Sequence, residues 1–409
     1  MNCRFCKTPV KTEFADLVNS PPSNSYLTEK QLNEPEMFYP LKVLVCEKCF
    51  LVQVDEYYKS SDIFSSDYAY FSSFSTSWLA HAKKYSEMMI ERFGFNSNSH
   101  VVEIASNDGY LIKNFKEKGI PVLGIEPTAN TAAAAKKNHG IDSVIDFFGI
   151  KLAKQLVADG KKADLLLGNN VLAHVPDIMD FVGGMKLVLK EKGVITMEFP
   201  HLYQLVLNNQ FDTIYHEHFS YISFTTVKQI FEANGLEMFD VQEIPTHGGS
   251  LRIFAKHKDD SSKPIGNAVA DLLKKEKDAG MLSISYYTSF GPKIQKIKND
   301  LLEFLIQQKR AGKKIVAYGA AAKGNTLLNY CGVKKDMIDF VVDANPAKQN
   351  KFMPASHIPI VTEQSIKDSK PDFILILPWN IKDEIVKQLD YVKGWGGKFV
   401  VPIPKLQIL

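Results

Sequence analysis

The chain of 409 residues lacks any apolar run of about 18 residues, which is the length that a membrane-spanning helix needs. Its first ten residues, MNCRFCKTPV, have no apolar core of the kind found in signal peptides, so we expect a cytoplasmic protein. The formal net charge is only +3, which argues against nucleic acid or a membrane surface as a partner. With 45% hydrophobic and 23% charged residues, the composition is that of a globular protein of two or three domains.

Cysteine is also scarce, but four of the five cysteines form two C-x-x-C pairs, Cys3 with Cys6 and Cys46 with Cys49. Each pair can place two thiolates on one tetrahedral ion, so the two pairs predict a structural zinc site with four protein ligands. Residues 7–45 separate the pairs and predict an inserted loop rich in proline and asparagine. Disulfides are the alternative, disfavoured because no secretory signal accompanies them. The remaining Cys331 is expected to be a core thiol.

An aromatic-rich linker follows the second cysteine pair, with tyrosines and phenylalanines among serines and aspartates. From about residue 75 to residue 93 the apolar spacing becomes helical, which marks the entry to a second domain. We therefore expect a zinc module with its linker over residues 1–73, a second domain over residues 74–258 and a third over residues 259–409.

The second domain alternates between short apolar runs and helical patterns. Strands are predicted at residues 100–107, 122–126, 144–147, 164–168 and 194–199, with helices at residues 110–118, 128–137 and 177–190. Alternation of this kind predicts an α/β fold with a doubly wound, Rossmann-like parallel sheet, whose ligand lies at the carboxyl ends of the strands.

The turn after the first of these strands carries the pattern E-x-A-x-N-x-G. Its small residues let the backbone approach a ligand, and Glu126 at the end of the second strand can accept hydrogen bonds from both ribose hydroxyls. Two glycines of a dinucleotide fingerprint are missing, which favours S-adenosylmethionine over a nicotinamide cofactor; a ligand-free α/β domain is the alternative. The predicted cofactor-binding residues are Glu103, Ala105, Asn107, Gly109, Tyr110, Glu126, Pro127, Asn169 and Asn170.

Titratable side chains are densest in residues 211–225, FDTIYHEHFSYISFT. An extended backbone would put Tyr215 and Glu217 on one face and His216 and His218 on the other, whereas a loop would let Tyr215, Glu217 and His218 converge. A polar loop with two satisfied histidines is the alternative. His201 is expected to begin a helix. The THGGS turn at residues 246–250 is expected to be a strand connection; approach to a ligand, which its glycines would allow, is the alternative.

The third domain begins after the polar stretch at residues 259–264 and repeats the alternating theme. Strands are predicted at residues 314–318, 338–343, 373–377 and 399–403, and a long helix at residues 292–310. Its first turn, GAAAKGN, opens a helix and carries a lysine, which favours the pyrophosphate of a sugar nucleotide; a vestigial turn without ligand is the alternative. The predicted substrate-binding residues are Gly319, Lys323, Asn325, Asp343, Asn345 and Lys351.

Several of these motifs occur together and in order: the cysteine pairs, VVEIASNDGYLIKNF, GIEPTAN, GNNVLAHVPD, YHEHFSYIS and AYGAAAKGN. Together they resemble the sugar C-methyltransferases of deoxysugar biosynthesis over nearly the whole chain. The resemblance implies a three-domain enzyme with a zinc module, a central S-adenosylmethionine domain and a C-terminal α/β domain. It also implies methylation at C3 of a nucleotide-linked 4-keto-6-deoxysugar, with Tyr215, Glu217 and His218 as the active-site set.

Methylation next to a ketone needs a base, a donor to the enolate oxygen and a group that orients the base. His218 is the candidate base, Tyr215 the candidate donor, and Glu217 would orient an imidazole or bind a sugar substituent. His174 could project over the ligand from the end of the fourth strand, and Tyr70, or Tyr68, would cover the site as an aromatic residue does in similar enzymes.

Two other functions remain open at this point: methyl transfer to oxygen or nitrogen of a small acceptor, and a non-catalytic module that senses a nucleotide. The dense YHEHFSY cluster disfavours the second. We expect the protein to be a monomer or a weak oligomer.

Overall fold

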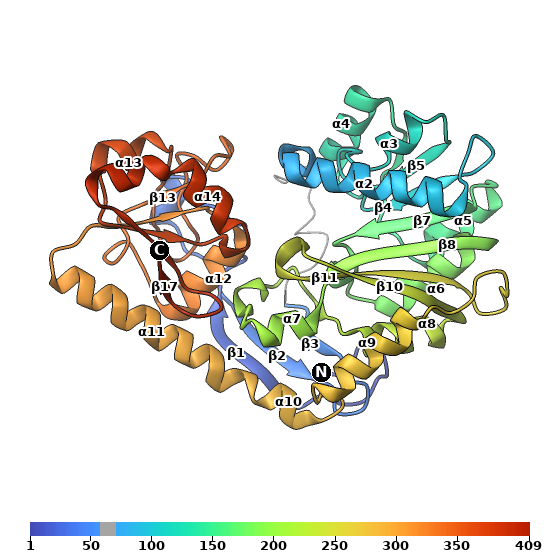
Figure 1. Ribbon diagram of the computed structural model, residues 1–409, viewed down its shortest axis with the longest axis horizontal. Helices are drawn as coiled ribbons and strands as arrows, with labels where there is room; N and C mark the ends of the chain where they lie inside the picture. Colours follow the sequence, from blue (N-terminus) through green and yellow to red (C-terminus); the bar gives the residue numbers. More distant parts are fainter. Residues whose placement is uncertain (58–70) are drawn as a thin grey trace.

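The computed structural model describes residues 1–57 and 71–409 (Figure 1). Three sheets organise these residues, with four, seven and six strands. The two larger sheets form two separate lobes, and the small sheet lies between the lobes on one side (Figure 1). No helix of the described ranges is long and apolar enough to cross a membrane.

The small sheet is antiparallel and contains, in order, β1 (Thr12–Ser20), β2 (Tyr39–Val45), β3 (Val52–Val54) and β9 (Ser220–Tyr221). The expectation of a loop between the cysteine pairs is therefore wrong for β1 and β2. Two register shifts within β1 interrupt the alternation of inward and outward side chains, which hides the strand in the sequence. β9 comes from the YHEHFSY segment, so this sheet joins the N-terminal module to the segment that carries the candidate catalytic residues.

The predicted doubly wound sheet of the central lobe is confirmed, in the order β10-β11-β8-β7-β4-β5-β6. Five of its strands are parallel: β4 (Val101–Ile104), β5 (Val122–Ile125), β6 (Ser143–Val144), β7 (Ala163–Asn169) and β8 (Leu189–Pro200). The hairpin of β10 (Leu236–Ile244) and β11 (Ser250–His257) extends the sheet antiparallel to β8. The carboxyl ends of β4, β5 and β7 therefore meet at one edge.

Helices flank this sheet on both faces (Figure 1). They are α2 (Thr76–Phe93), α3 (Lys113–Lys116), α4 (Ala129–His139), α5 (Ile150–Ala158), α6 (Ile178–Val188) and α8 (Phe224–Ala233). α7 (Leu202–Leu207) lies instead beside the small sheet and packs in the core of that sheet (Figure 1). The helix expected over residues 110–118 is only one turn long, because hydrogen-bonded turns occupy the residues before Lys113.

The C-terminal lobe contains a second Rossmann-like sheet, in the order β14-β13-β12-β15-β16-β17. Its strands are β12 (Ile315–Tyr318), β13 (Val341–Val342), β14 (Ile360–Val361), β15 (Phe373–Ile376), β16 (Lys398–Val401) and β17 (Gln407–Ile408). Its helices are α10 (Ile284–Thr288), α11 (Phe290–Arg310), α12 (Ala322–Cys331), α13 (Gln364–Ser369) and α14 (Lys382–Gln388).

A hydrophobic core shared with the small sheet holds this lobe in place. The ring of Phe14 on β1 stacks on that of Phe290 at the start of α11, with 4.6 Å between ring centroids. The expected domain limits stay predictions.

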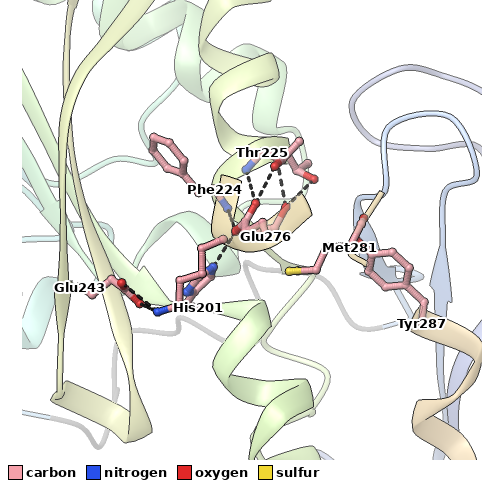
Figure 2. A network of polar contacts seen from close by, with 10 residues as sticks. His201, Phe224, Thr225, Glu243, Glu276, Met281 and Tyr287 are labelled. Atoms are coloured by element: carbon pink, nitrogen blue, oxygen red, sulfur yellow. Dashed lines mark hydrogen bonds and ion pairs between the residues drawn. The ribbon is translucent and has the colours of Figure 1, made fainter. Parts of the chain in front are cut away.

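A buried carboxylate joins α9 (Asn267–Asp278) to the central lobe (Figure 2). Glu276 Oε1 accepts hydrogen bonds from His201 Nε2 and from the backbone N–H of Phe224, each at 2.6 Å. Its Oε2 accepts from the backbone N–H of Thr225 at 2.8 Å and from the Thr225 hydroxyl at 2.6 Å. Glu276 thus satisfies the N-terminus of α8, and His201 begins α7, as expected from the sequence.

Candidate active site

The four N-terminal cysteines form a cluster in which all Sγ atoms lie within 4.8 Å of one another. The Cys3–Cys49 and Cys6–Cys46 Sγ pairs are each 3.5 Å apart. Tetrahedral zinc with Zn–S bonds of about 2.3 Å separates its thiolates by about 3.8 Å, so the cluster has the dimensions of a zinc site. Four protein ligands would leave no open position for a substrate, which fits a structural ion.

The zinc module contacts the segment of the candidate catalytic residues directly. Arg4, between two of the cysteines, donates from Nη1 to the carbonyl oxygen of Phe219 at 3.4 Å, and its guanidinium lies 5.3 Å from the centroid of the Phe219 ring. β3, which follows the second cysteine pair, binds β9. The module therefore holds the chain on the C-terminal side of His218.

The turn after β4 has an unusual backbone. Ala105 (φ 57°), Asn107 (φ 48°) and Gly109 (φ 77°) all lie in the left-handed region. Ala105 and Asn107 carry strain there because their Cβ atoms disfavour this conformation. A Cβ on Gly109 would lie 2.7 Å from Ile141 Cδ1, which explains the glycine. Strained turns of this kind occur at ligand sites.

The amide of Asn169 at the end of β7 is buried without a hydrogen-bond partner in the described part of the chain, and the buried carboxylate of Glu103 on β4 has only the backbone N–H of Ile112 to favour its charged form. Burial raises the pKa of Glu103 well above its ordinary value. Buried polar groups are normally hydrogen-bonded, so the unused hydrogen-bonding capacity of these two side chains indicates a polar ligand at this edge. These are residues that could hold S-adenosylmethionine.

Glu126 ends β5 and binds the strained turn. Its Oε2 accepts from the backbone N–H of Asn107 at 2.8 Å, and its Oε1 accepts from the backbone N–H of Thr128 at 2.9 Å, with Pro127 between. Oε1 also accepts from the Thr128 hydroxyl at 2.5 Å, whereas Oε2 can accept a further hydrogen bond, so a contact of Oε2 with a ribose hydroxyl is compatible with these bonds.

The other two predicted cofactor residues face aromatic neighbours. The Tyr110 ring lies 6.0 Å from that of Trp78 on α2. Asn170 pairs through Nδ2 with Nε2 of His247, at 3.1 Å, and the His247 ring lies 5.2 Å from Trp78. The sequence did not single out Trp78; its helical spacing on α2 resembles that of a core residue.

Tyr215 and His174 lie beside His218, because residues 214–219 form a turn and not a strand, whereas the Glu217 carboxylate meets Asn24. The His218 ring centroid lies 4.0 Å from that of Tyr215 and 4.6 Å from that of His174. His216 points elsewhere, and its Nε2 donates to the carbonyl oxygen of Pro40. The loop alternative considered for this stretch is therefore the observed one.

Backbone carbonyl groups orient both imidazoles. Nδ1 of His218 donates to the carbonyl oxygen of Thr213 at 2.9 Å, and Nδ1 of His174 donates to that of Glu217 at 2.8 Å. A carbonyl accepts and cannot donate, so Nδ1 carries the proton and Nε2 is the basic nitrogen of each neutral ring.

Burial sets the charge state of these groups. It lowers the pKa of His174 to about 4 and that of His218 well below the ordinary value, with the neighbouring His174 adding to the effect on His218. Both rings are neutral at pH 7. Burial also raises the pKa of Glu217 to about 7, against the opposing effect of a hydrogen bond from Asn24 Nδ2 to Glu217 Oε1 at 2.8 Å.

Lys323, in the first turn of α12, faces the same cluster from the C-terminal lobe. Its Nζ donates to Asn380 Oδ1 at 2.7 Å and lies 4.7 Å from the centroid of the Trp379 ring. Trp379 Nε1 in turn donates to Asp212 Oδ2 at 2.7 Å. Burial is the main cause of the low pKa of His218, and the positive charge of Lys323 adds a small contribution from the C-terminal lobe.

Of the other predicted substrate residues, some lie at the ends of strands and one has a structural role. Gly319 (φ 91°) forms the turn after β12, and a Cβ there would lie 2.4 Å from Pro378. Asn325 is buried and donates to the carbonyl oxygen of Ser23, which makes it a structural contact. Asp343 accepts from the backbone N–H of Asn345 at 2.8 Å at the end of β13.

Lys351 is not brought to Asp343 by any contact in the described ranges, whereas Lys348 is. Lys348 Nζ lies 3.8 Å from Asp343 Oδ2 and donates to the carbonyl oxygen of Ala320 at 2.7 Å. Both lysines lie in one irregular stretch, where spacing alone could not distinguish them.

A segment of the N-terminal module also reaches the site, and no pattern in the sequence indicated it beyond its proline and asparagine content. Residues 21–27 follow β1 and contact the YHEHFSY segment through Asn24 and the C-terminal lobe through Tyr26, whose hydroxyl donates to the carbonyl oxygen of Ala320 at 2.6 Å. The candidates Tyr70 and Tyr68 lie outside the described residues.

Family models match the chain in three consecutive parts. Residues 3–64 match a zinc binding domain, residues 78–241 a methyltransferase domain and residues 245–404 a C-methyltransferase C-terminal domain. The fold and the site thus define a zinc-containing methyltransferase, with S-adenosylmethionine as the methyl donor.

The C-methyltransferase NovU of Streptomyces niveus is 31% identical over 407 residues, which cover 100% of this chain and 96% of NovU. The chain belongs to this C-methyltransferase family, and the predicted family is confirmed.

Solved structures resemble only part of the chain. Magnesium protoporphyrin IX methyltransferase of Synechocystis PCC 6803 with bound SAH is 13% identical, with a TM-score of 0.35, over 43% of this chain and 81% of that one. The PH0226 protein of Pyrococcus horikoshii OT3 is also 13% identical, with a TM-score of 0.39, over 46% of this chain and 95% of that one. At these TM-scores neither likeness bears on function.

Proposed function

We propose that the enzyme methylates C3 of the sugar in a nucleotide-diphosphate-linked 4-keto-6-deoxysugar, through an enolate. S-adenosylmethionine, when bound at the carboxyl edge of the central sheet, supplies the methyl group. The protein would act in the cytoplasm as a monomer or a weak oligomer.

The observation that carries the proposal is the orientation of His218. Its Nδ1 is committed to the Thr213 carbonyl, which leaves Nε2 as the basic nitrogen of a neutral ring. A base in this state can remove the proton from C3, and the electron pair of the broken C–H bond then passes into the enolate with the C4 oxygen. Deprotonation of a carbon next to a ketone is the step that distinguishes carbon methylation from transfer to a hydroxyl.

Neighbouring groups support the remaining roles. Tyr215, whose ring packs on His218 at 4.0 Å, is our candidate donor to the enolate oxygen, and Glu217 our candidate for orienting the base or a sugar substituent. His174, held by the Glu217 carbonyl, would help to position the His218 ring through its contact with that ring. Tyr70 or Tyr68 remains a proposed cover.

The C-terminal lobe offers the groups for the nucleotide. Lys323 at the start of α12 would bind the pyrophosphate, together with the backbone of the turn at Gly319. Asp343 at the end of β13, with Asn345 beside it, would accept from the nucleoside. Such a substrate would bring its sugar toward His218, whose pKa already responds to the Lys323 charge.

The test uses S-adenosylmethionine and a panel of nucleotide-linked 4-keto-6-deoxysugars in deuterated water, followed by mass spectrometry. The wild type should add one methyl group and, without the cofactor, exchange the hydrogen at C3. His218→Asn should lower both rates about a hundredfold to ten-thousandfold, the usual contribution of a positioned base.

His139→Asn, at the end of α4, is the matched control and should keep both rates. Methyl transfer to oxygen or nitrogen without exchange at C3 would refute the enolate, and exchange retained in His218→Asn would refute the assigned base.

A further inference from the structure

Residues 21–27 of the zinc module connect the two lobes at the site. Asn24 donates from Nδ2 to Glu217 Oε1 at 2.8 Å, while the Ser23 carbonyl accepts from Asn325 and the Tyr26 hydroxyl binds the Ala320 carbonyl. Asn325 and Ala320 belong to the turn that carries Lys323. One short segment therefore contacts a candidate catalytic carboxylate and the candidate anion-binding turn.

Asn24 contacts only one of the two oxygens of the Glu217 carboxylate. Glu217 is only 5% exposed, whereas Asn24, which donates to it, is an exposed residue. Among the described residues, Asn24 is the one side chain that hydrogen-bonds the Glu217 carboxylate, through Oε1, and Oε2 remains able to meet a ligand. A hydrogen bond to one carboxylate oxygen restricts the rotation of the carboxylate group and so fixes the position of the other oxygen.

We propose that Asn24 is a positioning residue of the active site: its amide holds the Glu217 carboxylate in the orientation that the reaction requires. The inference rests on the proposed function. The zinc module would then contribute to catalysis through Asn24, in addition to the structural role of its zinc ion and cysteines.

Loss of the amide should have two effects. The carboxylate would lose its fixed rotation, which lowers kcat. Its pKa, already about 7, would rise further because the hydrogen bond favours the ionised form. The other groups that interact with Glu217 are the Tyr26 phenol on the same segment and His174, which binds the Glu217 carbonyl. Both are neutral at pH 7, since burial raises the pKa of Tyr26 and lowers that of His174.

The experiment compares wild type with Asn24→Leu, Asn24→Gln and Asn24→Asp for kcat, KM, S-adenosylmethionine affinity and the pH profile of methyl transfer. Asn24→Leu should lower kcat about tenfold to a hundredfold, the range for a hydrogen bond to a charged group, and move the acid limb of the profile to higher pH. Cofactor affinity should not change. Asn24→Gln, which keeps the amide, should recover part of kcat.

The pH dependence of Asn24→Asp separates a positioning role from a merely structural one. It puts a second carboxylate beside Glu217, and one shared proton restores a donor, so its activity relative to wild type should increase as the pH falls from 8 to 6. Asn33→Leu, on the exposed 3-10 turn of the same module, is the matched control and should behave as wild type.

An active wild type with unchanged kcat and pH profile in Asn24→Leu would overturn this inference alone. A wild type that methylates no member of the sugar panel would overturn the proposed function, and this inference with it.

Discussion

Glu276 offers a quantitative test of how α9 is held on the central lobe, through the substitution Glu276→Gln. The carboxylate is fully buried and accepts four hydrogen bonds, from His201, Phe224 and, twice, Thr225 (Figure 2). Burial would raise its pKa, but these bonds outweigh burial and the pKa is lowered. The carboxylate is therefore ionised at neutral pH.

The magnitude follows from what an amide cannot do. Glutamine keeps the shape but turns one acceptor oxygen into an NH2 group, which would face either the Thr225 donors or those of His201 and Phe224. Each buried donor left without a partner costs about 1–3 kcal/mol, and the NH2 group would leave two donors without one. We expect the free energy of unfolding to fall by about 3–5 kcal/mol at pH 7.

Urea unfolding followed by near-ultraviolet circular dichroism measures the loss, with Asp271→Asn on the exposed face of α9 as the matched control. Because the folded pKa of Glu276 is depressed, its contribution is present above the unfolded pKa of about 4.3 and is lost as the pH falls through the folded value. The gap between wild type and Glu276→Gln should therefore narrow in acid. A gap below about 1 kcal/mol at pH 7 would refute the reasoning.

Three further predictions concern the candidate ligand sites. Removal of zinc by a chelator, or Cys49→Ser, should loosen the β3–β9 pairing and lower methyl transfer at least tenfold, with recovery on zinc addition only in the chelated wild type. Asn169→Ala should weaken S-adenosylmethionine binding about tenfold by calorimetry, and equal affinity would contradict the cofactor placement. Lys323→Ala should weaken sugar-nucleotide binding about tenfold without affecting cofactor affinity, whereas Lys351→Ala should affect neither; equal loss of both ligands in Lys323→Ala would argue against the pyrophosphate contact.

The regular parts of the fold could be predicted because local pattern and tertiary structure agree there. Both doubly wound sheets follow apolar runs of four to seven residues between helical patterns, at β4, β7, β12 and β15. β1 escaped prediction because its register shifts break the alternation on which such a prediction depends. β9 has only two residues, and its pairing with β3 is a contact across 167 positions that no local pattern records.

In the candidate site too, residues next to regular elements could be predicted, whereas residues brought in by long-range contacts could not. Residues adjacent to a strand end, such as Glu126 and Asn169, could be placed from the sequence because parallel strands bring their carboxyl ends together. The contact of Asn24 with Glu217 spans 193 positions, and the choice between Lys348 and Lys351 depends on how one irregular loop turns. No periodic pattern in the sequence indicates either of these contacts, so they are known only from the structure.

A low pKa does not disqualify His218 as the base of the proposed reaction. The lowered value describes an isolated imidazolium in a buried site, where the charged form lacks solvation. Proton removal from C3 instead creates an imidazolium beside an enolate, and this pair attracts strongly at the low local dielectric of the site. Lys323, which disfavours the imidazolium, would favour the enolate, so the two effects offset each other. Burial of His218 thus keeps the resting base neutral and strengthens the ion pair that proton transfer forms.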